Sequence, residues 1–142
     1  MTRGRLIAAL AASVAAGDLL VKWLAVSVLH LANRPHTVNY VPGQASGRSG
    51  LLSIAFFGVL AVYVACRPTR RSVLGVGIVL GAACGNVLSI HLFAGGAPNF
   101  IHGPVTQDGT IWMNDADVVM PIGIVLTASG LAHQVVRRFR HV

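Results

Sequence analysis

Acidic side chains are scarce in this sequence: four aspartates stand among 142 residues, and charged residues of both signs make up 11% of the chain. Hydrophobic residues make up 54%, more than a soluble domain covers with so little polar surface. The scarcity of charge therefore excludes an ordinary soluble domain and indicates a membrane protein. The net charge of +7 comes from basic residues in short clusters between apolar runs, a pattern typical of membrane topology and not of nucleic-acid binding.

Cysteine is scarce as well. Cys66 ends one apolar segment and Cys84 lies in the middle of the next. A disulfide between them would have to join different depths of the membrane. We therefore expect both thiols to be free.

Four apolar segments approach the roughly 20 residues that a helix needs to cross a bilayer. The predicted spans are residues 6–31, 51–66, 73–94 and 118–136, with outer loops at 32–50 and 95–117. Arginine clusters precede the first span and follow the second and fourth, so the positive-inside rule places both termini in the cytoplasm. A cleaved signal peptide is the alternative for the first span, but its apolar pattern runs on to Leu31, beyond a signal-peptide core.

The outer loops are long and rich in turn-forming residues. In the second, Asp108-Gly109 is a favoured pair for a hairpin turn between two short strands. The sequence thus predicts an all-α integral membrane protein of one domain, residues 1–142. Its fold would be a four-helix transmembrane bundle with a small β-containing outer region.

Polar residues gather at one predicted depth. Asp18 and Lys22 are spaced four apart in the first span, so they can pair on one helix face, which indicates a structural role. Helical rise brings Asn86 of the third span toward the outer boundary, where Asn114 and Asp117 enter the fourth. Such a cluster suits a substrate that is part lipid and part peptide.

Three motifs in this cluster together resemble those of the bacterial lipoprotein signal peptidases, also called signal peptidase II. Asp18-Leu-Leu-Val-Lys22 resembles the family's first-helix Asp and Lys. Gly-Ala-Ala-Cys-Gly-Asn, which ends at Asn86, is similar to its third-helix motif, and Asn114-Asp-Ala-Asp117 to its Asn-x-Ala-Asp motif. The family consists of four-helix aspartic proteases that cut signal peptides from diacylglyceryl-modified prolipoproteins.

The resemblance implies a multi-pass protein of the bacterial cytoplasmic membrane, with no metal or other cofactor. It implies Asp117 as one acid of a catalytic pair. It also implies substrate-binding residues in three places, namely Asn86 and Asn114, Asn99 in the second outer loop, and Gly43 in the first.

The chain departs from the family at the other acid of the pair, where Ser89 stands in place of an aspartate. Aspartic proteolysis needs one ionised carboxylate to activate water and one protonated carboxyl to polarise the scissile carbonyl. Asp117 alone cannot fill both roles. We therefore predict a protein that binds lipid-modified prolipoprotein signal peptides, or lipid, with its peptidase activity lost. A regulator, a decoy or a subunit of a larger membrane complex would each fit.

Two alternatives remain open. An active divergent peptidase could use Asp115 with Asp117 if the backbone there is extended, because alternate side chains then point the same way. Against this, Asp115 suits a helix N-cap or first turn. A small proton-coupled transporter could use Asp18 as its acid, although the long outer loops argue against it.

Two histidine-based sites are weaker hypotheses. Ser89 and His91, two residues apart on a helix, do not face each other as a nucleophile and base should. His91, His102 and Asp117 could bind zinc only as a scattered set without a recognisable ligand spacing.

Overall fold

The computed structural model describes residues 2–31, 47–66, 69–93, 97–106 and 109–139. Gly43 of the first outer loop and Asp108 of the predicted turn lie outside these residues, so the expectations for them stay predictions.

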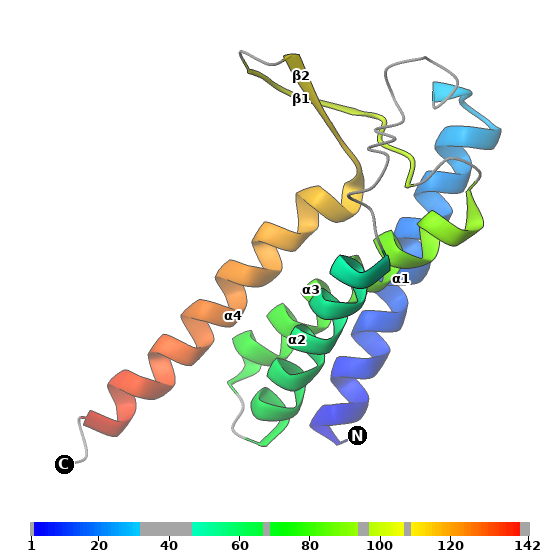
Figure 1. Cartoon of the computed structure of the whole chain (residues 1–142). Coiled ribbons are helices and arrows are strands. Elements are labelled where there is room, and N and C mark those ends of the chain that lie inside the picture. The colour runs from blue at the N-terminus through cyan, green and yellow to red at the C-terminus, as the bar shows by residue number, and fades with distance from the viewer. Residues whose placement is uncertain (1, 32–46, 67–68, 94–96, 107–108, 140–142) are drawn as a thin grey trace.

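Four helices make up most of the described chain (Figure 1). They are α1 (Arg3–Ser27), α2 (Gly47–Cys66), α3 (Arg70–Leu92) and α4 (Asp115–Phe139). Within the described residues, three of them, α1, α3 and α4, are long and apolar enough to cross a membrane, and α2 contains the shorter apolar stretch Ile54–Val64. The predicted fold class, a membrane bundle of four helices with a small β-containing region, is confirmed. The division of the chain into spans and outer loops stays a prediction.

Helix α1 ends at Ser27, although the apolar run continues to Leu31. The Leu29 N–H donates to the Leu24 carbonyl oxygen at 3.0 Å, which widens the last turn. His30 then takes a positive φ of 50°, a conformation that often ends helices. Apolar character therefore extends beyond the helix, because the backbone turns before the run stops.

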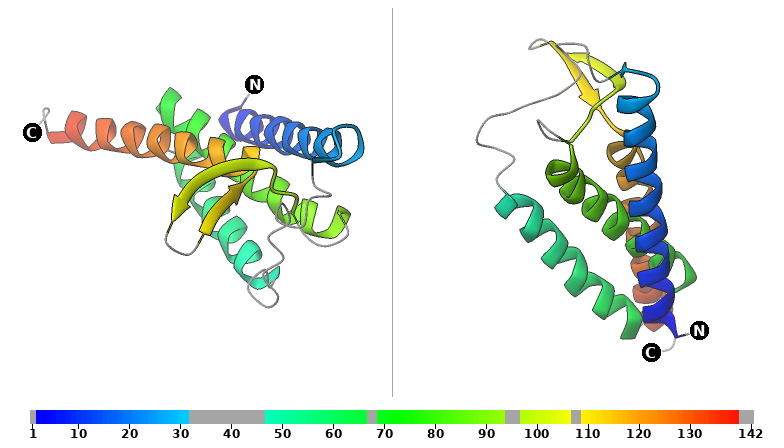
Figure 2. Two further views of the ribbon diagram at one scale, coloured as in Figure 1. Left: turned by 90° about the horizontal axis from the view of Figure 1, so that it is seen from above. Right: turned by 90° about the vertical axis from the view of Figure 1, so that its right-hand side faces the viewer.

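Helix α3 lies at the centre of the bundle and packs against each of the other three helices. Helices α1 and α4 contact each other much less than either contacts α3. Two further views show this arrangement, with α2 at one side and the hairpin above the bundle (Figure 2). We call the end that carries the hairpin the hairpin end, and the end where α1 begins and α4 ends the terminal end (Figure 1).

Glycines along α3 allow α1 to approach closely. A Cβ atom at Gly77 would come within 2.8 Å of the Leu10 side chain, and one at Gly81 within 2.6 Å of the Ala11 carbonyl oxygen. Gly77, Gly81 and Gly85 recur every four residues, so they share one helix face, as small residues do where membrane helices meet. The close α1–α3 contact therefore depends on the absence of side chains at these glycines.

The contact between α3 and α4 has the same origin. A Cβ atom at Gly75 would lie 2.5 Å from the backbone of Gly123 and of Thr127. The buried Thr127 hydroxyl lies at this contact and donates to the Gly123 carbonyl oxygen at 2.8 Å. Its hydrogen bond is thus made within α4. At the terminal end, an apolar cluster of Ile7, Val64, Val73 and Val76 fills the space between α1, α2 and α3.

Strands β1 (Ile101–Thr106) and β2 (Gly109–Met113) form an antiparallel pair at the hairpin end. Ile101 pairs with Met113, and the register shifts between His102 and Val105. Asn114 alone separates β2 from α4. The hairpin therefore sets the direction in which α4 begins, and with it the position of the acids in its first turn.

Candidate functional site

Lys22 lies at the centre of a polar cluster at the hairpin end. Its side chain is completely buried between α1 and α3. The ammonium Nζ donates to Asp18 Oδ2 at 2.8 Å, to Asn86 Oδ1 at 2.6 Å and to Ser89 Oγ at 3.3 Å. A lysine ammonium has three N–H donors, so every proton of this buried charge has an acceptor.

Asp18 is the acidic partner, one helical turn earlier on α1, and its side chain is 2% exposed. The pair can lie against α3 because position 85 is glycine: a Cβ there would collide with the Asp18 carboxylate. The row of small residues on α3 thus ends inside the polar cluster. The structure brings together the two residues that the i, i+4 spacing paired.

Ser89 is fully buried and fully engaged. Its hydroxyl accepts from Lys22 and donates to the Asn86 backbone carbonyl oxygen at 2.8 Å. A side chain held in this way supports the lysine and cannot act as a base. His91, which would have to activate it as a nucleophile, is exposed at the other side of the same turn.

Asp117 is half-buried in the first turn of α4. Its Oδ1 accepts from the Asn86 Nδ2 amide at 3.3 Å, and its Oδ2 accepts from the Asn114 backbone N–H at 3.1 Å. The Asn114 side-chain oxygen in turn accepts from the Asp117 N–H at 3.2 Å. This reciprocal exchange is a capping box, with Asn114 as the N-cap and Asp117 at the third helical position. Asp117 therefore also has a structural role at the start of α4.

Asn99 joins the cluster through the segment before β1. Its side-chain oxygen accepts from Asn114 Nδ2 at 2.7 Å, while Asn114 is 2% exposed. The amides of Asn86, Asn99 and Asn114 thus form a continuous group around Asp117. Asn86, Asn99 and Asn114, the three predicted substrate-binding residues that the structure describes, therefore lie together.

Asp115 is the first residue of α4, and its carboxyl group lies within hydrogen-bonding reach of the Asp18 carboxyl group on α1. The oxygens Asp18 Oδ1 and Asp115 Oδ1 are both buried without a hydrogen-bond partner. Because Asp115 and Asp117 are both helical, two residues apart, they do not point the same way. The structure brings Asp115 to Asp18 instead of to Asp117.

These contacts form a closed ring through three helices, from Asp115 to Asp18, to Lys22, to Asn86, to Asp117 and back to α4. Within the described residues the ring carries three carboxyl groups and one ammonium. Such a ring can hold N–H groups of a peptide backbone and can bind protons. Among the described residues, no three histidine, cysteine or acidic side chains are grouped so that they could hold a metal ion.

Two features of the ring escaped sequence reasoning. Asn-x-x-Asp is a capping-box spacing, and it could have identified the reciprocal bonds of Asn114 and Asp117 directly. The contact of Asp115 with Asp18 had no sequence signal, because the two residues are far apart along the chain.

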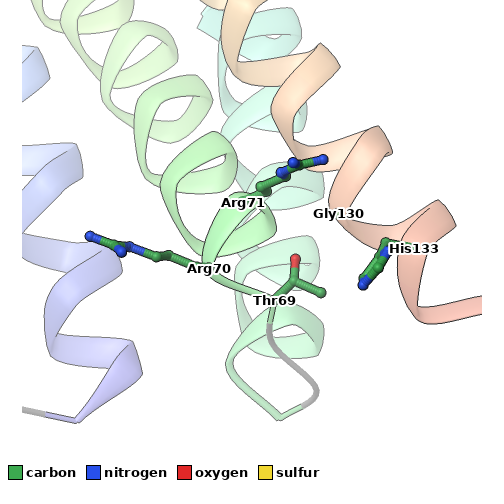
Figure 3. Close-up of a pocket in the computed structure, with 5 residues that line it drawn as sticks. All are labelled: Thr69, Arg70, Arg71, Gly130 and His133. Carbon is green, nitrogen blue, oxygen red and sulfur yellow. The ribbon is translucent and has the colours of Figure 1, made fainter. Parts of the chain in front are cut away.

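A second polar region lies at the terminal end, where a cavity of about 260 Å³ opens between α3 and α4 (Figure 3). Its lining residues are Thr69, Arg70, Arg71, Gly130 and His133. Arg70 and Arg71 are exposed, and Arg70 points away from His133 (Figure 3). Of the described residues that line this cavity, the two arginines and His133 are exposed.

Comparison with known proteins supports the fold. No family model and no curated protein matches the chain. Among solved structures, the chain is similar to one described as a bacterial membrane enzyme, determined by the in meso method at 2.3 Å resolution. The match has a TM-score of 0.63 and 15% sequence identity, and it covers 91% of this chain and 88% of the other. The two proteins share a fold, and this chain is a multi-pass membrane protein.

Proposed function

We propose that this protein is a signal peptidase II-like membrane protein that binds lipid-modified prolipoprotein signal peptides and does not cleave them. The three motifs, the bundle of four helices and the polar ring at the hairpin end support this assignment. In this proposal the protein lies in the bacterial cytoplasmic membrane with both termini in the cytoplasm, so the hairpin end faces outward.

The environment of Ser89 is the observation that carries the proposal. The hydroxyl is buried between Lys22 and a backbone carbonyl oxygen, at the position where the family has its second acid. Around Asp117, the described hydrogen bonds come from amide and backbone N–H groups. No carboxyl group at position 89 is available to share a proton with Asp117, and the paired chemistry of an aspartic protease has lost one member.

Binding requires less of the site than cleavage does. The half-buried Asn86, Asn99 and Asp117 present amide and carboxylate groups at the level where a peptide would leave the hydrocarbon. Large apolar residues on the outer faces of α1 and α4 are exposed, among them Leu20, Trp23, Ile122 and Val125, and these are suited to acyl chains. Peptide and lipid could thus be held by different parts of one surface.

An active peptidase that uses Asp115 with Asp117 is the alternative. It would require Asp115 to leave Asp18 and turn toward Asp117. Such a rearrangement would abandon a buried contact between α1 and α4. The proposal of binding without cleavage needs no such change.

The test is photo-crosslinking combined with a cleavage assay on the purified protein in detergent. The substrate is a diacylglyceryl-modified prolipoprotein, and the same precursor without its lipid is the control. We expect a crosslink to the lipidated precursor that exceeds that to the control, with no cleaved product. Cleavage by the unmodified protein that disappears in Asp117→Asn would contradict the proposal, and Asp115→Asn would then show whether Asp115 is the second acid.

The Ser89→Asp variant sharpens the same assay. It restores a carboxyl group at the position of the missing acid. Cleavage by this variant alone would support a peptidase fold that has lost its chemistry through this residue. Absence of any crosslink in the unmodified protein, under conditions where an active signal peptidase II binds the same precursor, would overturn the binding assignment.

A further inference from the structure

Two buried carboxylate oxygens in the ring have no hydrogen-bond donor. One is Oδ1 of Asp18 and the other is Oδ1 of Asp115. The Asp18 side chain is 2% exposed, so water cannot readily replace the missing donor. The two carboxyl groups lie within hydrogen-bonding reach of each other, across the boundary between α1 and α4.

An ionised carboxylate only accepts hydrogen bonds. If Asp18 and Asp115 were both ionised, their facing oxygens would repel each other and both would stay unsatisfied in a buried place. A single proton between them removes both problems, because it creates an O–H donor toward an ionised acceptor. Bonds of this kind are among the shorter and stronger ones in proteins.

The surrounding charges favour the same arrangement. On α1, Lys22 is bound to the other oxygen of Asp18. On α4, Asp117 adds a further negative charge, while the described contacts of α3 with the ring come from the uncharged Asn86 and Ser89. Three ionised carboxylates beside one ammonium would leave two negative charges in a largely buried ring, and a bound proton reduces this excess by one.

We propose that Asp18 and Asp115 form a proton-binding site that joins α1 to α4 at the hairpin end. A hard metal cation is a poorer occupant, because it needs about six or more oxygen ligands and the Lys22 ammonium already holds one oxygen of the pair. The site does not depend on the proposed binding of signal peptides.

The proton acts as a connection between two helices that otherwise touch little. Helices α1 and α4 each pack mainly on α3 and contact each other little, so the acid pair lies between two helices with few other mutual contacts. When the proton leaves, two like charges face each other at this point. The folded protein then holds a proton that the unfolded chain releases, so its stability falls as the pH rises.

Infrared difference spectroscopy tests the bound proton directly. The purified protein is titrated from mildly acidic to mildly alkaline pH, and the C=O stretching band of a protonated carboxyl group is followed. We expect a band at mildly acidic pH, where an ordinary aspartate is already ionised, that fades as the pH rises and is missing in Asp115→Asn and in Asp18→Asn. It should remain in Asp117→Asn, because both Asp117 oxygens already accept from N–H groups. Absence of the band at mildly acidic pH in the unmodified protein would overturn the proposal.

Thermal unfolding at the two ends of the same pH range provides an independent measurement. An asparagine at position 115 can donate an N–H to Asp18 at any pH, so Asp115→Asn should abolish the fall in melting temperature at alkaline pH. Asp115→Ala removes the contact and should lower the melting temperature at acidic pH. Equal pH dependence in Asp115→Asn and the unmodified protein would contradict the proton site. So would stabilisation at neutral pH that appears only on addition of sodium or calcium salt, since it would indicate a metal cation.

Discussion

Charged side chains are exposed at one end of α3 and buried at the other. At the terminal end, Arg70 and Arg71 are exposed, and the start of the helix is satisfied locally by the Thr69–Ser72 capping box. At the hairpin end, Lys22 is fully buried and bonded to Asn86, 64 residues away in the sequence. The first arrangement depends on neighbours along the chain, whereas the second exists only when α1, α3 and α4 are assembled.

This difference teaches where the fold depends on polar groups. An exposed arginine at a helix end keeps its hydration and contributes little to the packing. A buried ammonium loses its hydration, and hydrogen bonds to all of its N–H groups are needed to offset that loss. We therefore expect substitutions at the hairpin end to have the larger effects, and four experiments test that order.

The largest effect is expected for Lys22→Met, which leaves the buried Asp18 charge without its partner. We expect a loss of about 3–5 kcal/mol in stability, measured by thermal unfolding in detergent with circular dichroism. The double variant Lys22→Met/Asp18→Asn removes the unpaired charge and should recover much of that loss. If the double variant is no more stable than the single one, the buried charge is not the cause.

Gly85→Ala is expected to have the next largest effect. The added methyl group collides with the Asp18 carboxylate, so α1 and α3 must separate or the ion pair must shift. Overpacking of this kind costs about 1–3 kcal/mol. Gly17→Ala is the matched control, because no atom lies within 4 Å of a Cβ there. It should leave stability unchanged or raise it, and similar losses in both variants would contradict the steric explanation.

Each end of the bundle has a capping box, so the loss of the same kind of hydrogen bond can be compared between the two ends. Thr69→Ala removes the cap of α3 and Asn114→Ala removes that of α4, each at a cost of about 0.5–2 kcal/mol. Asn114→Ala also removes the contact with Asn99, so it should be the more damaging of the two. Thr69→Ser keeps a hydroxyl acceptor and is expected to melt close to the unmodified protein. A larger loss in Thr69→Ala than in Asn114→Ala would reverse the proposed order of the two ends.

The smallest effect is expected for Arg71→Gln. The side chain is exposed at the terminal end, and substitutions of such residues usually change stability by less than about 0.5 kcal/mol. Its melting curve in detergent should overlay that of the unmodified protein. A loss comparable to that of Gly85→Ala would show that the terminal end also depends on a specific charge.

Much of the fold could be predicted from local patterns. The length and apolarity of the runs determine the helices, since a helix satisfies its own backbone in lipid. Residue spacing alone paired Asp18 with Lys22, and the motif positions brought Asn86, Asn114 and Asp117 to one level. What no local pattern indicated was the end of α1 at Ser27, where the backbone turns inside an apolar run.

By itself, then, the sequence determined that this chain lies in a membrane as a helical bundle with its acids and amides at one end. Only the tertiary structure decided how those groups are paired. Gly85 lets Asp18 reach α3, Ser89 completes the bonds of Lys22, and the start of α4 directs Asp115 toward α1. The physical reason is that helical periodicity sets which residues share a face, whereas packing distance between helices sets which faces meet.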